Sequence, residues 1–208
     1  VGTGAPRGRD LEVPGRKGPT IVDTDEGPRA DTTAESLAKL RPAFPSAAKS
    51  NPSLSVTAGN ASSLNDGAAA VVVVSEAYAR EHGLTILGRI TGYATGAGDP
   101  RDLFFAPITA VNNLMKKAGT TIGHYDLIEA NEAFASQSLA DGNGLGWDAS
   151  RVNVNGGAIA LGHPIGASGT RVLVTLLHAL ADRKLRTGLA TLCLGGGDAV
   201  ALSVERVD

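Results

Sequence analysis

The chain has a single cysteine, Cys193, among its 208 residues, and its aromatic content is only 4%. One thiol excludes an internal disulfide framework and is typical of a reducing compartment. The formal net charge of −2 provides no electrostatic attraction to nucleic acid or to a membrane surface. The sequence contains no signal peptide and no run of 18 apolar residues, so we expect a soluble, cytoplasmic protein.

Glycine, in contrast, is abundant at 27 residues, and 42% of the chain is apolar, mostly alanine, valine and leucine. This composition suits closely packed helices and strands joined by tight turns, and it is sufficient for a core. Val1 stands in place of an initiator methionine, and the first residues show no periodicity. We therefore expect a cut end within a longer protein or a processed terminus.

From residue 86 onward, short apolar segments alternate with longer amphipathic ones, which predicts an α/β layout. The expected strands are 86–95, 127–130, 151–154, 189–194 and 199–207, and the expected helices are 107–118, 134–140 and 169–184. The last of these helices is apolar almost all round, which predicts burial on every side.

The first 85 residues are less regular, with several prolines. We expect a short strand at 20–22 and a short helix that Thr32 and Glu35 open as a capping box. The run 68–74 has no polar face and predicts a fully buried strand, followed by a helix over 76–83.

Two glycine-rich turns carry the reactive side chains. Cys193 comes just before the triple glycine at 195–197, and His163 lies in the glycine-rich run 153–169. Each turn is reached by an apolar, strand-like segment. A turn that ends a strand allows backbone N–H groups and a reactive side chain to point at one atom, as acyl transfer requires.

The candidate catalytic residues and turns also have simpler, structural interpretations. A lone cysteine is more often a small buried hydrophobe than a catalyst. The run 153–169 could cradle a phosphate at a helix N-terminus, although it contains neither of the two common glycine-rich nucleotide motifs. Glu132 could be a base or a carboxylate that caps the next helix. The histidines interpreted as structural are His82, His124 and His178.

As an ordered set, four motifs resemble the thiolase family, the acyl-CoA:acetyl-CoA acyltransferases. They are Thr-Ala-Gly-Asn-Ala-Ser at 57–62, Asn-Glu-Ala-Phe at 131–134, Gly-His-Pro at 162–164 and Cys-Leu-Gly-Gly-Gly at 193–197. The resemblance covers nearly the whole chain but only the C-terminal half of the family, and it implies the layered α-β-α-β-α thiolase fold.

The same resemblance implies a division into parts. We expect a partial loop domain at 1–63, the last strand and helix of the N-terminal half-domain at 64–85, and the C-terminal half-domain at 86–208.

The resemblance also implies roles for four catalytic residues. Cys193 is expected to be the acid/base cysteine that takes and returns the α-proton of the second acetyl-CoA. His163 is expected to donate to the thioester enolate, and Asn131 to hold the water that completes this oxyanion hole. The backbone N–H of Gly195 is expected to donate to a second oxyanion hole. A free thiol titrates near about 8.5, and turn amides or a nearby imidazole can lower that pKa.

Four further residues are expected to bind substrate by the same resemblance. Ser62, beside Ala61, would contact the pantetheine arm of coenzyme A. Phe134 would form a wall of the acyl pocket, near Leu103, although the run 103–106 replaces a common Met-Gly-x-Gly of the family. Coenzyme A is then a substrate, and neither a retained cofactor nor a metal is implied.

The leading hypothesis is therefore a thiolase-type acyltransferase of fatty acid metabolism. It would condense two acetyl-CoA to acetoacetyl-CoA, or cleave 3-ketoacyl-CoA with CoA, within a longer enzyme whose N-terminal half supplies the nucleophilic cysteine. The chain alone is expected to be inactive, because Cys193 is its only thiol. The expected partners are CoA and acyl-CoA, that N-terminal half and identical subunits of a dimer or tetramer. The alternative is a catalytically inactive acyl-CoA-binding or structural half of a split or heteromeric thiolase.

Overall fold

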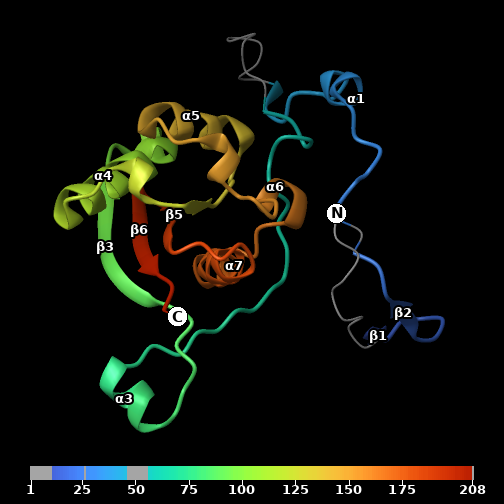
Figure 1. The fold of residues 1–208 in the computed structure, drawn as a ribbon. Helices are drawn as coiled ribbons and strands as arrows, with labels where there is room; N and C mark the ends of the chain where they lie inside the picture. The colour runs from blue at the N-terminus through green and yellow to red at the C-terminus, as the bar shows by residue number, and fades with distance from the viewer. Residues whose placement is uncertain (1–10, 26, 46–55, 208) are drawn as a thin grey trace.

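The structure is a computed structural model that describes residues 11–25, 27–45 and 56–207, and a four-stranded sheet lies at its centre (Figure 1). The strand order is β3-β6-β5-β4. The strands are β3 Arg89–Ala97, β4 Leu127–Ala130, β5 Thr187–Leu194 and β6 Asp198–Glu205. β4 and β5 are parallel, whereas the other two pairs are antiparallel, so β4 and β5 end at the same edge of the sheet.

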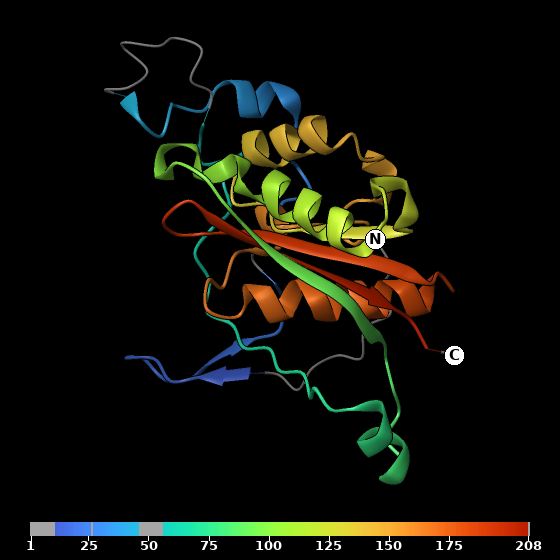
Figure 2. The same cartoon turned by 90° about the vertical axis from the view of Figure 1, so that its left-hand side faces the viewer.

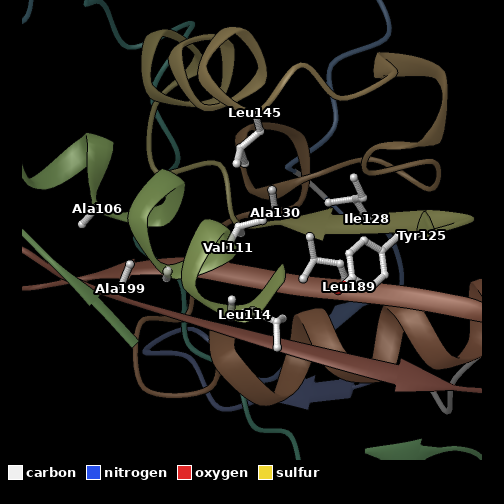
Figure 3. Close-up of a cluster of buried hydrophobic side chains, with 11 residues drawn as sticks. Ala106, Val111, Leu114, Tyr125, Ile128, Ala130, Leu145, Leu189 and Ala199 are labelled. Atoms are coloured by element: carbon white, nitrogen blue, oxygen red, sulfur yellow. The ribbon is translucent and has the colours of Figure 1, made fainter. Parts of the chain in front are cut away.

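Helices cover both faces of the sheet (Figure 2). Helices α4 (Ala106–Ala118) and α5 (Ala135–Leu145) lie on one face, and α7 (Ser168–Asp182) lies on the other. Each interface has its own apolar cluster. The first includes Val111, Leu114 and Leu189 (Figure 3), and the second includes Leu176 and Leu180. Each fully buried side chain of this kind contributes about 1.5–3 kcal/mol.

The remaining elements are short. They are β1 Leu11–Val13, β2 Thr20–Val22, α1 Ala34–Ala38, α3 Glu76–Glu81, η1 Pro100–Phe105, η2 Ile122–His124, η3 Ala149–Arg151 and α6 Ala158–Leu161. In the described part of the chain, no helix has the length and apolar character needed to span a membrane.

Several elements confirm the sequence-based predictions because local signals determine them. The strand over 127–130 and the short strand at 20–22 have the predicted bounds. Helix α4 stops at Gly119, whose φ of 66° is in the left-handed region that favours glycine. The hairpin between β5 and β6 turns through Gly196 and Gly197, with φ values of 90° and 95°.

Two predictions in the first 85 residues are wrong. The capping box of α1 uses Thr33 and Ser36 and so begins one residue later than expected. The run 68–74 is not a strand, and Val72 and Val73 are 85% and 70% exposed. A strand needs a hydrogen-bonded neighbour, and no described residue pairs with this run.

The strand expected over 151–154 is reduced to a single bridge between Val152 and Ile128. The backbone leaves the extended region at Asn153, which has a φ of 48°. Its side chain takes over the pairing, because Oδ1 accepts from the N–H of Ala130 at 2.9 Å and Nδ2 donates to the Ala130 carbonyl at 2.8 Å. The first strand of the sheet also starts later than predicted, at Arg89 rather than at residue 86.

Helix α5 runs past the stop predicted near Gly142 and ends at Gly146, which has a φ of 63°. Gly142 and Gly144 lie inside the helix, and there is no room for a side chain at either position. A Cβ would lie 2.6 Å from Nε1 of Trp147 at the first and 2.4 Å from Cδ1 of Ile108 at the second. These glycines therefore permit close packing and do not end the helix.

Helix α7 is not buried on every side by the described residues. Val172, Leu176 and Leu180 face the sheet and are buried, whereas His178 is exposed. The outer apolar residues of α7, including Leu173, line a groove together with the exposed valines at 71–74.

Candidate active site

The ends of β4 and β5 place Asn131 and Cys193 at one edge of the sheet. Asn131 directly follows β4, and its N–H donates to the carbonyl of Thr191 at 3.0 Å. Cys193 lies two residues further along β5 and is half-buried. Parallel pairing therefore brings the amide and the thiol to the same edge from positions 62 apart in the sequence.

His163 contacts both Asn131 and the start of α7. Its Nε2 lies 3.4 Å from Nδ2 of Asn131, and its Nδ1 lies 2.6 Å from Oγ of Ser168. The Ser168 hydroxyl also donates to the carbonyl of Pro164 at 3.0 Å. While its one proton goes to Pro164, the hydroxyl accepts from Nδ1–H and leaves Nε2 as an acceptor facing the Asn131 amide; if the hydroxyl turns to donate to Nδ1 instead, Nε2 carries the proton. Only the second tautomer lets Nε2 donate to an oxyanion.

Burial keeps the His163 imidazole neutral. The pKa of His163 is lowered by burial first and then by the positive charge of Arg171. Arg171 Nη1 lies 3.9 Å from Oε2 of Glu129, whose pKa is raised to about 7, mainly by burial. A neutral imidazole can donate one hydrogen bond to developing negative charge without releasing its proton.

Residues 61–64 pass between the loop after β4 and the His163 turn. Ala61 bridges Phe134, and Ser62 donates to the carbonyl of Ala133 from both its N–H (3.2 Å) and its Oγ (3.0 Å). His163 N–H donates to the carbonyl of Ser63 at 2.8 Å. The two residues predicted to bind the pantetheine arm are thus held against the segment after Asn131, and the next two residues contact His163.

Contacts of η1 link the remaining predicted residues to this edge. The ring of Phe104, adjacent to Leu103, packs edge-to-face on Phe134 with centroids 5.1 Å apart. The N–H of Gly98 donates to the carbonyl of Gly197 at 2.9 Å, which ties the start of η1 to the turn that carries Gly195. Contacts therefore join the segments that carry Ala61, Ser62, Asn131, Phe134 and His163, and Cys193 and Gly195 follow at the end of β5, whereas Leu103 is placed near them only through Phe104.

The surroundings of Cys193 raise the pKa of its thiol, whereas turn amides or a nearby imidazole were expected to lower it. A backbone hydrogen bond lowers the pKa of the thiol, as expected for a turn. Burial outweighs it, and the negative charge of Asp141 raises the pKa further, so the net shift is upward. Cys193 is therefore a thiol at neutral pH and a strong base once ionised.

Glu132 has a structural partner that favours capping over base catalysis. Its Oε2 accepts from the N–H of Ile159 in the first turn of α6, and its Oε1 accepts from Nδ2 of Asn153, both at 3.1 Å. The helix that it caps is not α5, which comes next in the chain, but α6, which lies further on.

Sequence reasoning missed four residues around the site: Glu129, Asp141, Ser168 and Arg171. Glu129 had a usable signal, because it is the one charge within a short apolar strand. For metals, the described residues contain no group of three or more His, Cys, Asp or Glu side chains placed to hold an ion.

Comparison with protein families gives two matches that together span most of the chain. The family model described as "Thiolase, C-terminal domain" matches residues 84–206, and the one described as "Thiolase, N-terminal domain" matches residues 10–77. Part of the N-terminal domain is thus present beside the C-terminal one.

Curated proteins and solved structures show the same likeness. The chain is 60% identical to an acetyl-CoA acetyltransferase of Pseudomonas aeruginosa over 197 residues, 94% of this chain and 49% of that protein. It superposes on a Bacillus anthracis acetyl-CoA acetyltransferase with a TM-score of 0.86 at 45% identity, covering 95% of this chain and 49% of the other. Superposition on a human mitochondrial 3-ketoacyl-CoA thiolase in complex with CoA gives a TM-score of 0.80 at 41% identity. The match covers 90% of this chain and 46% of the other. The chain spans about half the length of these relatives, and its layered α/β fold is theirs.

Proposed function

Since this chain belongs to the thiolase family, we propose that it forms the enolate-generating part of a thiolase-type acyltransferase that acts on acetyl-CoA or 3-ketoacyl-CoA. One observation carries the proposal. Three segments that are distant in the sequence converge at the edge of the sheet where β5 ends just after Cys193, with Nδ2 of Asn131 3.4 Å from Nε2 of His163. Asn131 is buried, whereas His163 and Cys193 are partly exposed, so polar groups meet here at a place that solvent reaches.

In the proposed condensation, the Cys193 thiolate takes the α-proton of acetyl-CoA. The negative charge that develops on the thioester oxygen is held by Nε2–H of His163 and by a water bound to Asn131. Each oxyanion donor of this kind is worth on the order of 3–4 kcal/mol in the transition state. The raised pKa of Cys193 suits a base that must attack a weakly acidic carbon.

The enolate carbon then attacks the acyl carbon of a thioester on a nucleophilic cysteine outside this chain. A C–C bond forms, the C–S bond to that cysteine breaks, and its sulfur leaves as a thiolate. Gly195 N–H stabilises the tetrahedral oxyanion. In the reverse direction, CoA cleaves 3-ketoacyl-CoA, and Cys193 returns its proton to the acetyl-CoA enolate.

The substrate-binding part of the proposal rests on residues 61–64, which lie between the loop after β4 and the turn that carries His163. Ser62 and Ala61 would contact the pantetheine arm, with the Ser62 hydroxyl still able to accept a hydrogen bond. Phe134 and Leu103 would line the acyl pocket, where the contact between Phe104 and Phe134 narrows the space. Coenzyme A acts here as a substrate.

The proposed domain division is a partial loop domain at 1–63, the end of the N-terminal half-domain at 64–85 and the C-terminal half-domain at 86–208. The two family matches change over between residues 77 and 84, which supports a boundary near there. The whole enzyme would contain a complete N-terminal half and would assemble from identical subunits. A single cysteine supports a cytoplasmic location.

The test is Cys193→Ala in the full-length protein that contains this chain. Condensation of acetyl-CoA should be nearly abolished, while acylation of the nucleophilic cysteine remains detectable by mass spectrometry. Leu194→Ala, at the exposed neighbouring position, is the matched control and should retain condensation. Unchanged condensation by the Cys193 variant would refute the acid/base role.

The alternative is an inactive acyl-CoA-binding or structural half of a split thiolase, and it is favoured by the single thiol of this chain. The 208-residue chain by itself should not cleave acetoacetyl-CoA, because the acyl-enzyme needs a second cysteine. Adding a separately expressed N-terminal half should restore thiolysis if the enzyme hypothesis holds. Turnover by the chain alone would show that Cys193 also serves as the nucleophile.

A further inference from the structure

A carboxyl group that the proposed reaction does not use is buried inside helix α5. Asp141 is 0% exposed and lies on the inward stripe formed with Gln137 and Leu145, each four residues apart. The Gln137 amide donates to Oδ2 of Asp141 and accepts from the N–H of Ala133 at 3.0 Å. Oδ1 of Asp141 has no hydrogen-bond partner among the described residues. A buried carboxyl oxygen without a donor is costly and therefore needs an explanation.

This stripe faces the side of the sheet on which Cys193 lies. Leu145 packs in one cluster with Leu189 of β5 and Ala199 of β6 (Figure 3). Side chains alternate along a strand, so Cys193, four residues after Leu189, points to the same face. Ala199 is moreover the direct partner of Cys193 in the hairpin. Because α5 begins just after β4, at the edge where β5 ends, Asp141 and Cys193 lie on the same side of the sheet, and the last turn of α5 packs on the core through Leu145.

The interaction between the two groups is electrostatic. Burial raises the pKa of Asp141 to about 7, and the Asp141 charge raises the pKa of Cys193 beyond the effect of burial. The elements packed on α5 are η1 and α4. Their charged groups, Arg101, Asp102, Lys116 and Lys117, are exposed.

β6, which pairs with the strand of Cys193, contributes Asp198 next to the turn and Glu205 at the far end. Asp198 is exposed, and Glu205 is paired with Arg186 at 2.6 Å. The buried Glu129 of β4 is directed to Arg171 of α7 on the other face, so Asp141 is the buried carboxyl on the Cys193 side of the sheet.

We propose that Asp141, held by Gln137, is a positioning residue that favours the thiol form of Cys193. The inference rests on the proposed acid/base role of Cys193. The thiol is the form that protonates the acetyl-CoA enolate during thiolysis, so Asp141 biases the pair toward proton donation. Two neighbouring groups that oppose each other's ionisation titrate in two steps that belong to the pair.

The experiment measures the rate of Cys193 alkylation by iodoacetamide as a function of pH in the folded full-length protein. Mass spectrometry of the Cys193 peptide separates this thiol from any other. Asp141→Asn keeps the shape and can still accept from Gln137. It should move the titration of Cys193 to lower pH and raise the alkylation rate at pH 7.5 by roughly threefold or more. Asp198→Asn, an exposed carboxyl beside the same turn, is the matched control and should leave the rate unchanged.

An unchanged or slower rate in the Asp141 variant, or an equal effect of both variants, would overturn the proposal. A second readout needs no variant. In the wild type, the logarithm of the alkylation rate should rise with pH by less than one unit per pH unit between about pH 7 and 9, because the carboxyl ionises first. A single titration of unit slope would also overturn it. Since alkylation does not require turnover, the coupling can be confirmed even if the proposed acyl transfer fails.

Discussion

Nδ1 of His163 lies 2.6 Å from Oγ of Ser168, a residue in the first turn of α7. The serine hydroxyl also reaches the Pro164 carbonyl, so it is the group that selects which imidazole nitrogen carries the proton. A donor at Nε2 requires this hydroxyl to turn toward the ring.

Ser168→Ala should therefore lower kcat for condensation by roughly tenfold or more, with a smaller effect on KM. The reason is that His163 loses the partner that fixes its tautomer and its orientation, whereas substrate contacts remain. Ser136→Ala, at an exposed position of α5, is the control and should match the wild type in steady-state kinetics. A change confined to KM would contradict the tautomer argument.

Gly157→Ala tests the Glu132 cap of α6. An added Cβ would lie 2.2 Å from Cδ of Glu132, so the carboxylate that accepts from Ile159 must move. We expect a loss of about 1–3 kcal/mol in the free energy of unfolding, typical of overpacking. Gly166→Ala, where a Cβ would have nothing within 4 Å, should be nearly neutral in the same thermal unfolding measurement. Equal stability of the two variants would contradict this.

The buried carboxyl of Asp141 predicts how stability depends on pH. Its pKa rises from 3.8 to about 7 on folding, so the folded state holds a proton that the unfolded state releases. This stabilisation is complete below pH 3.8 and is lost as pH rises to about 7, a loss on the order of 4 kcal/mol.

Asp141→Asn should remove that loss, so the variant should exceed the wild type in stability at pH 8. The control is Asp148→Asn, because hydrogen bonds from Ser150 lower the pKa of this exposed carboxyl. The Asp148 variant should keep the wild-type slope between pH 5 and 8 in denaturant titrations. A wild-type stability that increases over that range would show that other groups dominate.

An apolar groove of about 630 Å³ predicts that the isolated 208-residue chain associates with itself. The groove lies between residues 70–75, the approach to β3 and the outer face of α7. Replacing Val72 and Val73, 85% and 70% exposed, by lysine should shift the chain toward monomer in size-exclusion chromatography. Leu139→Lys, at a 69% exposed site on α5, should not. A wild-type chain that elutes as a monomer and unfolds in one sharp transition would contradict the prediction.

The sequence by itself determined the elements that short-range rules govern, and it named the candidate residues of the site. The four-residue apolar strand at 127–130, the helix that Gly119 ends and the glycine turn after Cys193 all follow from backbone preferences within a few residues. The eight candidate site residues came from ordered motifs; the structure joins several of their segments at one edge of the sheet, and their roles stay predictions.

Only the tertiary structure decided what depends on contacts between distant residues. Asn153 leaves its strand because its side chain bonds to Ala130, and Gly142 lies within α5 at a position where Trp147 leaves no room for a side chain. The valines at 71–74 read as a buried strand, but a strand exists only where a neighbour pairs with it. The upward pKa shift of Cys193 likewise arises from burial and from Asp141, 52 positions away, and no local pattern carries that information.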